Sequence, residues 1–268
     1  MSRSNPSASG TPNPSTRWFE WNGEKGIVRY YDKEAKQNIE VGDHFGFVLL
    51  DQLGAVGGWH DPSESGIYSN EVRDTRQDVM VVKSFKGGVL AEGLYAAIKD
   101  KVNNSGGGFV ANCYIAYKTD GGGFALGLIK FKGAALGAWM EFSKAHRAEL
   151  DTKAVAITGF TEGKKGRVVF KTPIFGIKGL SKASNDEAVA LDVVLQKFLA
   201  GYLTRTKRDQ VEHVEDPSPS EMVPGHAGVS DAYEEIGEPS NITDDDIPFS
   251  WLPPLILPAL GMLGAVLA

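Results

Sequence analysis

The alternation of hydrophobic and polar positions divides the chain into short strands separated by glycine-rich turns. Apolar or alternating runs of strand length are predicted at 18–21, 27–31, 45–53, 78–85, 109–118, 124–132, 155–160 and 167–170. Asn22-Gly23 and the glycines at 121–123 each separate two such runs, so we predict a hairpin at both places and a third around the polar turn 162–166. Glycine pairs at 57–58 and 87–88 are expected to end the strands before them.

Helical spacing of apolar residues predicts three helices, over 90–102, 134–150 and 184–202. The third has the clearest amphipathic pattern, and Ser184 is placed to cap its start. Its apolar stripe is formed by Val189, Leu195, Phe198, Leu199 and Tyr202. We therefore expect a mainly β domain with added helices, an α+β fold. Short strands, glycine turns and few helices fit a small, partly closed barrel, and the OB-fold is the barrel most often used to bind single strands.

The ends of the chain differ in composition from this patterned body, which we assign to residues 17–208 as one domain. Residues 1–16 are mostly Ser, Pro, Asn and Gly and are predicted to be a disordered arm without a secretory signal. Residues 209–243 are rich in Glu, Asp, Pro, Ser and Gly and are predicted to be an acidic flexible linker. The single cysteine, Cys113, excludes an internal disulfide and is typical of a cytoplasmic protein.

Charge is distributed unevenly, and this matters more than the formal net charge of −6. Residues 17–208 contain 27 Lys and Arg against 22 Asp and Glu, a balance of +5, whereas residues 209–268 contain 12 Asp and Glu and no Lys or Arg. Arg3 supplies the one remaining charge. A basic body suits a polyanion, because neutralised phosphates release counterions. The acidic tail either competes for the same groove or serves only solubility, and charge alone does not separate these interpretations.

Single-stranded DNA requires aromatic faces for its bases and cations for its phosphates. Two stretches interleave these groups: Arg29-Tyr30-Tyr31, and Lys130-Phe131-Lys132, in which both lysines share one face of a predicted strand and Phe131 takes the other. Other rings, among them Trp59, Tyr68 and Phe85, are weaker candidates, because an aromatic residue more often belongs to the core. The candidate DNA-binding residues are Arg29, Tyr30, Tyr31, Lys83, Lys86, Tyr117, Lys118, Lys130, Phe131 and Lys132.

The sequence contains little that predicts catalysis. The glycine triplets at 106–108 and 121–123 lack the Gly-Lys-Ser/Thr ending of a phosphate-binding loop. The five histidines are scattered without metal-ligand spacing, and His60-Asp61 is better explained as a loop histidine at an Asp-Pro turn than as part of a metal or nuclease site. We therefore expect no enzyme activity, no metal and no cofactor. A nucleic-acid enzyme with an unrecognised site is the weakest alternative.

The segment Asp244-Asp245-Asp246-Ile247-Pro248-Phe249 resembles the acidic tip of bacterial single-stranded DNA-binding proteins, and several phage replication proteins carry related tails. The match covers six residues, and the order of basic body, acidic linker and tip agrees with it. In that family the tip recruits replication and repair proteins. Ile247 and Phe249 can fill an apolar pocket while the aspartates face a basic rim. The resemblance implies a phage-type protein that binds and protects single-stranded DNA in replication or recombination and recruits partners through 244–249.

Residues 250–268 follow the tip here, whereas in the family the phenylalanine ends the chain and its carboxylate takes part in binding. Residues 251–268 carry no charge and match the lower length limit of a membrane span, but Pro253, Pro254 and Pro258 interrupt them. Three interpretations stay open: a membrane anchor, a tail that self-associates or docks on the body, and a dispensable extension. A membrane-associated or protein-interaction module anchored by this tail is therefore the alternative function.

Overall fold

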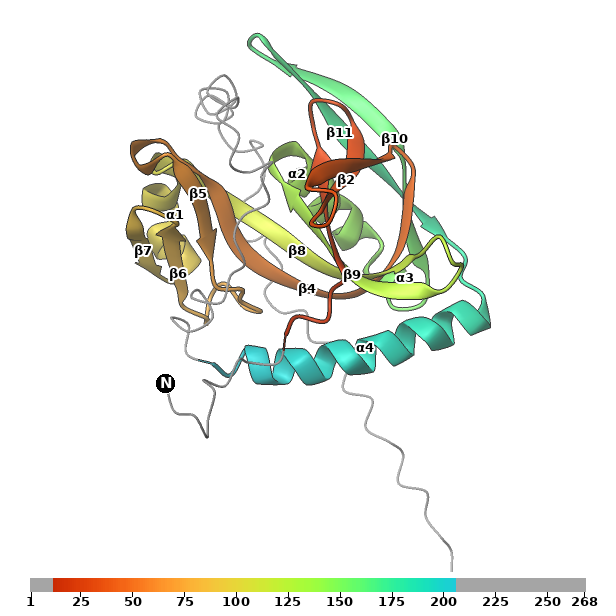
Figure 1. Cartoon of the computed structure of the whole chain (residues 1–268). Coiled ribbons are helices and arrows are strands. Elements are labelled where there is room, and N and C mark those ends of the chain that lie inside the picture. Colours follow the sequence, from red (N-terminus) through yellow and green to blue (C-terminus); the bar gives the residue numbers. More distant parts are fainter. Residues whose placement is uncertain (1–11, 206–268) are drawn as a thin grey trace, which may run out of the picture.

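The computed structural model describes residues 12–205, and within this range eleven strands join in one sheet, accompanied by four α-helices and the short 3-10 helix η1 (Asp61–Ser63) (Figure 1). The strands are β1 (Arg17–Asn22), β2 (Ile27–Asp32), β3 (Gln37–Gly42), β4 (Phe45–His60), β5 (Ser65–Ser69), β6 (Met80–Ser84), β7 (Gly88–Gly93), β8 (Gly107–Lys118), β9 (Phe124–Lys132), β10 (Ala154–Lys165) and β11 (Val168–Lys178). The helices are α1 (Tyr95–Asn104), α2 (Gly133–Ala145), α3 (Arg147–Leu150) and α4 (Lys182–Tyr202). The predicted α+β class is confirmed, and the sheet is not closed.

The long strand β4 organises the sheet, whose hydrogen-bonded order is β3-β2-β1-β9-β8-β4-β5-β6-β7. Along one edge, β4 pairs with β8 from Phe47 to Gly58. Along the other edge, the first residues of β4 pair with β10, and its last residues, from Gly57 onward, pair with β5. Two arms therefore branch from β4, one formed by β10 and β11 and one by β5, β6 and β7.

Alternate residues of β8 and β9 pack against helices on opposite faces of the sheet. On one face, Cys113 and Phe131 belong to an aromatic-rich core, where the ring of Trp139 from α2 stacks on Phe131 with 5.1 Å between centroids. On the other face, Tyr114 and Leu128 pack against the buried residues of α4, which runs along the sheet in Figure 1. Burial of apolar side chains on both sides thus fixes the middle strands between two helices.

A second core supports the β5–β7 arm. There α1 packs Ile98 and Val102 against Val56 of β4 and Val82 of β6. Val56 is paired with Phe109 of β8, which contacts both cores, so α1 and α2 lie on the same face of the sheet. Among residues 12–205, α4 is the helix that packs on the opposite face and covers part of it.

The adjacent glycines at 57–58 were expected to end this strand, but β4 continues through them to His60. A Cβ atom on Gly58 would lie 2.2 Å from the carbonyl oxygen of Gly106. Glycine is present at position 58 because two backbones approach closely there, and sequence alone does not distinguish this use from a turn.

Other predicted boundaries shift because tertiary pairing overrides local pattern. Residues 88–93 pair with β6 as strand β7, so the helix predicted from 90 begins only at Tyr95. The helix predicted over 134–150 breaks at His146 into α2 and α3. The strands β3 and β5 were not predicted, while the hairpins at 22–23, 121–123 and 162–166 are confirmed.

The amphipathic prediction for α4 is correct in most positions. Leu195, Phe198 and Leu199 are buried, but Val189 is 55% exposed, because the buried stripe passes through Ala188 instead. The N-cap is Ser181, whose Oγ accepts a hydrogen bond from the backbone N–H of Ser184 at 3.2 Å, so the helix begins earlier than predicted.

The tail assignments fall on residues outside the described range. These are most of the arm 1–16, the linker 209–243, the tip 244–249 and the extension 250–268. Within the arm, Thr16 donates its backbone N–H to Leu126 O at 2.8 Å and Ser15 is buried, so packing against the sheet begins before Arg17. Among the helices of residues 12–205, none has the length and apolar character needed to cross a membrane.

Candidate nucleic-acid interface

The register between strands places several predicted cations on one face of the sheet, because directly opposed residues in neighbouring strands share a face. Glu20 of β1 lies opposite Arg29 of β2 and Lys130 of β9. Lys132, two residues further along β9, points to the same side as Lys130 and lies opposite Val110 of β8. This is the face on which α4 packs, beyond the area that the helix covers.

The same face continues across β4 into the β5–β7 arm. Val110 and Gly108 are two residues apart in β8, so they are on the same face. Gly108 lies opposite Gly57 of β4, and Gly57 lies opposite Tyr68 of β5. Tyr68 lies opposite Lys83 of β6. From β9 to β6 there are four strand steps, about 19 Å at ~4.8 Å per step. We call this surface the basic face and define it by Arg29, Tyr31, Trp59, Tyr68, Lys83, Phe85, Lys130 and Lys132.

Three aromatic rings lie in the β5–β7 part of the basic face. The rings of Tyr68 and Phe85 stack with 4.2 Å between centroids, and both side chains are half-buried. Trp59 lies opposite Gly66, which is two residues from Tyr68 along β5, so Trp59 and Tyr68 are on the same side of the sheet. Trp59 is also half-buried. These three rings were weaker candidates in the sequence. Phe85 is close to Lys83 and Lys86 along the chain, but Trp59 and Tyr68 are far from the lysines of β9, and only the strand pairing brings all three rings onto the face of Lys130 and Lys132.

The cations of the basic face differ in what they already contact. Arg29 contacts Glu20 at 2.6 Å, and both side chains are largely buried. Burial opposes ionisation of Glu20, but the nearby Lys132 and Arg29 outweigh it and lower its pKa. Lys132 is exposed, and Lys83 and Lys130 are half-buried. Three carboxylates share this side of the sheet: Glu20 and Glu40 lie opposite Arg29, and Glu92 lies opposite Val81, two residues from Lys83. The four cations therefore leave a small positive balance, with Lys130 and Lys132 adjacent on this side of β9 as the part best suited to phosphates.

The remaining predicted residues lie elsewhere. Phe131 and Tyr117 are buried in the aromatic core, and Tyr30 packs edge-on against Phe19 on the same inner side, so their rings are not part of the basic face. Lys118 ends β8 at the opposite end of the β8–β9 pair from Lys132. Lys86 lies in the β6–β7 turn, where its Nζ donates to Glu64 O at 3.4 Å.

A buried polar network lies next to the basic face and beneath the end of α4. Glu71 is buried and accepts hydrogen bonds from Asn112 Nδ2 at 2.6 Å and from the Tyr114 hydroxyl at 2.8 Å. Its burial raises its pKa, more than these donors lower it. Asn112 lies opposite Lys130, so the network borders the cations directly.

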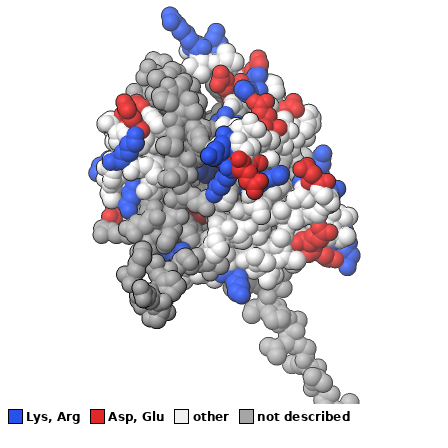
Figure 2. Space-filling model, viewed as in Figure 1, with Lys and Arg blue, Asp and Glu red and all other residues white. Residues whose placement is uncertain are grey.

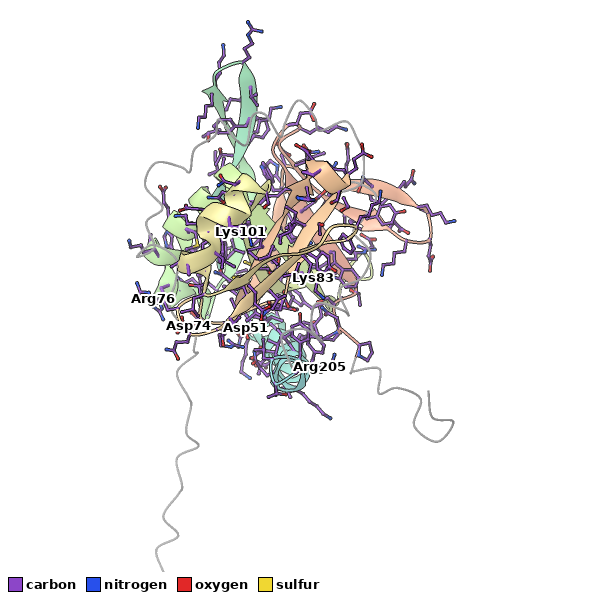
Figure 3. The ribbon with its side chains drawn as sticks, turned by 90° about the vertical axis from the view of Figure 1, so that its left-hand side faces the viewer. Asp51, Asp74, Arg76, Lys83, Lys101 and Arg205 are labelled. Carbon is purple, nitrogen blue, oxygen red and sulfur yellow. The ribbon has the colours of Figure 1, made fainter. Side chains whose placement is uncertain are left out.

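A second buried pair joins β4 to the chain that follows β5. Arg73 donates through two nitrogens to Asp51, at 3.0 and 2.7 Å, and Gln196 of α4 donates to the same carboxylate at 3.0 Å. In the view of Figure 3, Asp51 lies next to Asp74, below Lys83 and above Arg205. Gln196 thereby connects α4 to the fork-like Arg73–Asp51 pair beside the basic face.

Among residues 12–205, no group of His, Cys, Asp and Glu is arranged to hold a metal ion. Cys113 is buried, and its burial raises the pKa of its thiol. No protein-family model, curated protein or solved structure matches this chain. The basic face itself presents cations and aromatic rings, groups that can contact a polyanion with flat groups.

Proposed function

We propose that this protein binds and protects single-stranded DNA without sequence preference and without catalysis. The observation that carries the proposal is the strand register, which puts Lys130, Lys132 and Lys83 on the same face as the stacked pair Tyr68 and Phe85. Cations along a groove hold phosphates, and each base that stacks on a ring contributes roughly 1–3 kcal/mol whatever its identity. A duplex keeps its bases stacked inside, so the rings favour single strands.

The shape around the aromatic core supports an OB-fold-like half-barrel as part of this proposal. The backbone N–H of Lys171 in β11 donates to Gly23 O in the β1–β2 turn at 2.7 Å. Trp21 Nε1 of β1 donates to Lys171 O at 2.8 Å. These bonds bring β11 against the β1–β2 hairpin without completing the sheet, which is the partial closure expected of a small binding barrel.

The acidic tip 244–249 extends the proposal to phage DNA replication or recombination. Its resemblance to the partner-binding tip of bacterial single-stranded DNA-binding proteins supports recruitment of a replication or repair protein. The aspartates and the Ile-Pro-Phe group would act together, the charges steering a basic partner and the apolar residues anchoring it. A chain with Phe249→Ala that captures a basic-rimmed partner as well as the intact chain does would remove this part of the proposal.

The basic face is tested by removing its two neighbouring lysines. We expect K130Q/K132Q to bind fluorescent oligo-dT more weakly in an anisotropy titration, with a log–log salt slope shallower by roughly 1.4, from ~0.7 per phosphate contact. The control is Lys144→Gln, an exposed lysine on α2 across the sheet. Equal binding by K130Q/K132Q and the control chain would refute the assignment of this face.

A further inference from the structure

The hairpin formed by β10 and β11 extends beyond the sheet as a two-stranded ribbon (Figure 1). β10 pairs with β4 only from Val155 to Ile157, where its other edge pairs with β11, and from Phe160 to Lys165 it pairs with β11 alone. The ribbon leaves from the first residues of β4, whereas the β5 arm joins β4 at Gly57, ten residues beyond Phe47. At ~3.3 Å per residue, these two junctions are roughly 33 Å apart along β4.

The ribbon is held in place at Lys171, which pairs with Glu162 part-way along it. The Lys171 backbone donates its N–H to Gly23 O and accepts at its carbonyl oxygen from the Trp21 indole Nε1, and the Lys171 Nζ lies 4.7 Å from the centre of the Phe160 ring. Across the ribbon, Phe170 lies against Gly163, where a Cβ atom would come within 2.5 Å of the ring. The absence of a side chain at position 163 therefore lets the Phe170 ring lie across its partner strand.

The tip of the ribbon concentrates positive charge. Lys164, Lys165 and Arg167 lie within four residues, around a tight turn at Gly166, whose φ is +57°. Lys164 and Arg167 are exposed, and Figure 2 shows Lys and Arg side chains at this tip, at the top of the view. The nearest acidic residue along the ribbon is Glu162, so the segment from 160 to 171, with Lys171 included, keeps a balance of +3.

We propose that the ribbon tip is a second contact for the phosphate backbone of single-stranded DNA, separate from the basic face. This inference rests on the proposed function. Successive residues of a ribbon point to opposite sides, so Lys164 and Lys165 present cations on both sides of a narrow, anchored arm. A DNA strand that passes from the basic face to the tip would be held at two places. Only an oligonucleotide long enough to reach both places would bind more tightly because of the second one.

The test compares a short and a long oligonucleotide, dT8 and dT30, each titrated with the full chain and with K164Q/K165Q/R167Q. For dT30 we expect weaker binding by the variant and a salt slope shallower by roughly 2, from three contacts at ~0.7 each. For dT8, held on the basic face alone, we expect no change. The matched control is K101Q/K144Q/K182Q, which removes three exposed lysines from the helices α1, α2 and α4.

The outcomes separate this inference from the proposed function. If the intact chain binds neither oligonucleotide, the proposed function fails. If it binds both and the ribbon variant matches the control variant on dT30, the second contact is overturned. Equal losses on dT8 and dT30 also overturn it, because the tip would then belong to the primary site. Coincident thermal unfolding curves of the variant and the intact chain show that a loss on dT30 comes from charge.

Discussion

Alternation along a strand decides, residue by residue, which predicted groups reach the basic face. The pattern Lys130-Phe131-Lys132 is confirmed as predicted, with Phe131 fully buried and the lysines on the other side. The neighbouring pair Tyr30 and Tyr31 was not separable from sequence, because both residues are aromatic and neither periodicity nor charge distinguishes the inner from the outer ring. Tyr30 packs inward on Phe19 and Tyr31 shares the side of Arg29.

At the same scale, Glu71 predicts how the unfolding free energy depends on pH. Its pKa is raised by burial in the folded protein, so the protonated form is favoured there. Its contribution to the free energy of unfolding is fully present below the unfolded pKa of 4.5 and falls as pH rises above that value. We expect Glu71→Gln, which imitates the neutral acid, to lose less stability than the intact chain between pH 4.5 and pH 7.

Urea unfolding followed by tryptophan fluorescence at both pH values measures this difference. The control is Glu141→Gln, an exposed carboxyl on α2. If the pH profiles of Glu71→Gln and the intact chain run parallel, Glu71 is not responsible for the pH dependence.

At the scale of elements, β4 shows why glycine is ambiguous in a sequence. The glycines at 54, 57 and 58 lie inside a strand that supports both arms of the sheet. Gly54 accommodates the ring of Phe109, and Gly58 accommodates the backbone at Gly106. The neighbours that require glycine are about fifty residues away in the chain, so local pattern predicted the strand and misplaced its end.

The close approach at Gly58 has a measurable cost when a methyl group is added. We expect Gly58→Ala to lower the free energy of unfolding by at least about 2 kcal/mol, because the atom in the way is backbone that cannot turn aside. Gly108→Ala, at a position of β8 with no atom within 4 Å of an added Cβ, is the matched control. Equal urea midpoints for the two variants would contradict this account of β4.

For the whole molecule, the division of charge was predictable and the surface that uses it was not. Counting residues separates a basic body from an acidic tail. Bringing Lys132 and Lys83 onto one face requires the pairings through β8, β4 and β5, which connect segments up to about seventy residues apart. Aromatic residues and lysines far apart in sequence carry no local signal of that proximity.

The acidic tail gives a prediction at this scale. If its 12 carboxylates compete with phosphates for the basic face, a chain ending at Arg208 should bind oligo-dT more tightly than the intact chain, most clearly at low salt. The hydrophobic cores described above lie within residues 12–205, which this shorter chain retains. Identical affinities at low salt would assign the tail a role in solubility instead.

The central claim is that the basic face binds single strands by phosphate contacts and base stacking. The most direct measurement is an anisotropy competition in which the intact chain, bound to fluorescent dT30, is challenged with unlabelled dT30 or a 30-base-pair duplex over a range of salt concentrations. We predict that dT30 competes far better than the duplex and that affinity falls steeply as salt rises. Equal or better competition by the duplex, or affinity that does not change with salt, would contradict the account.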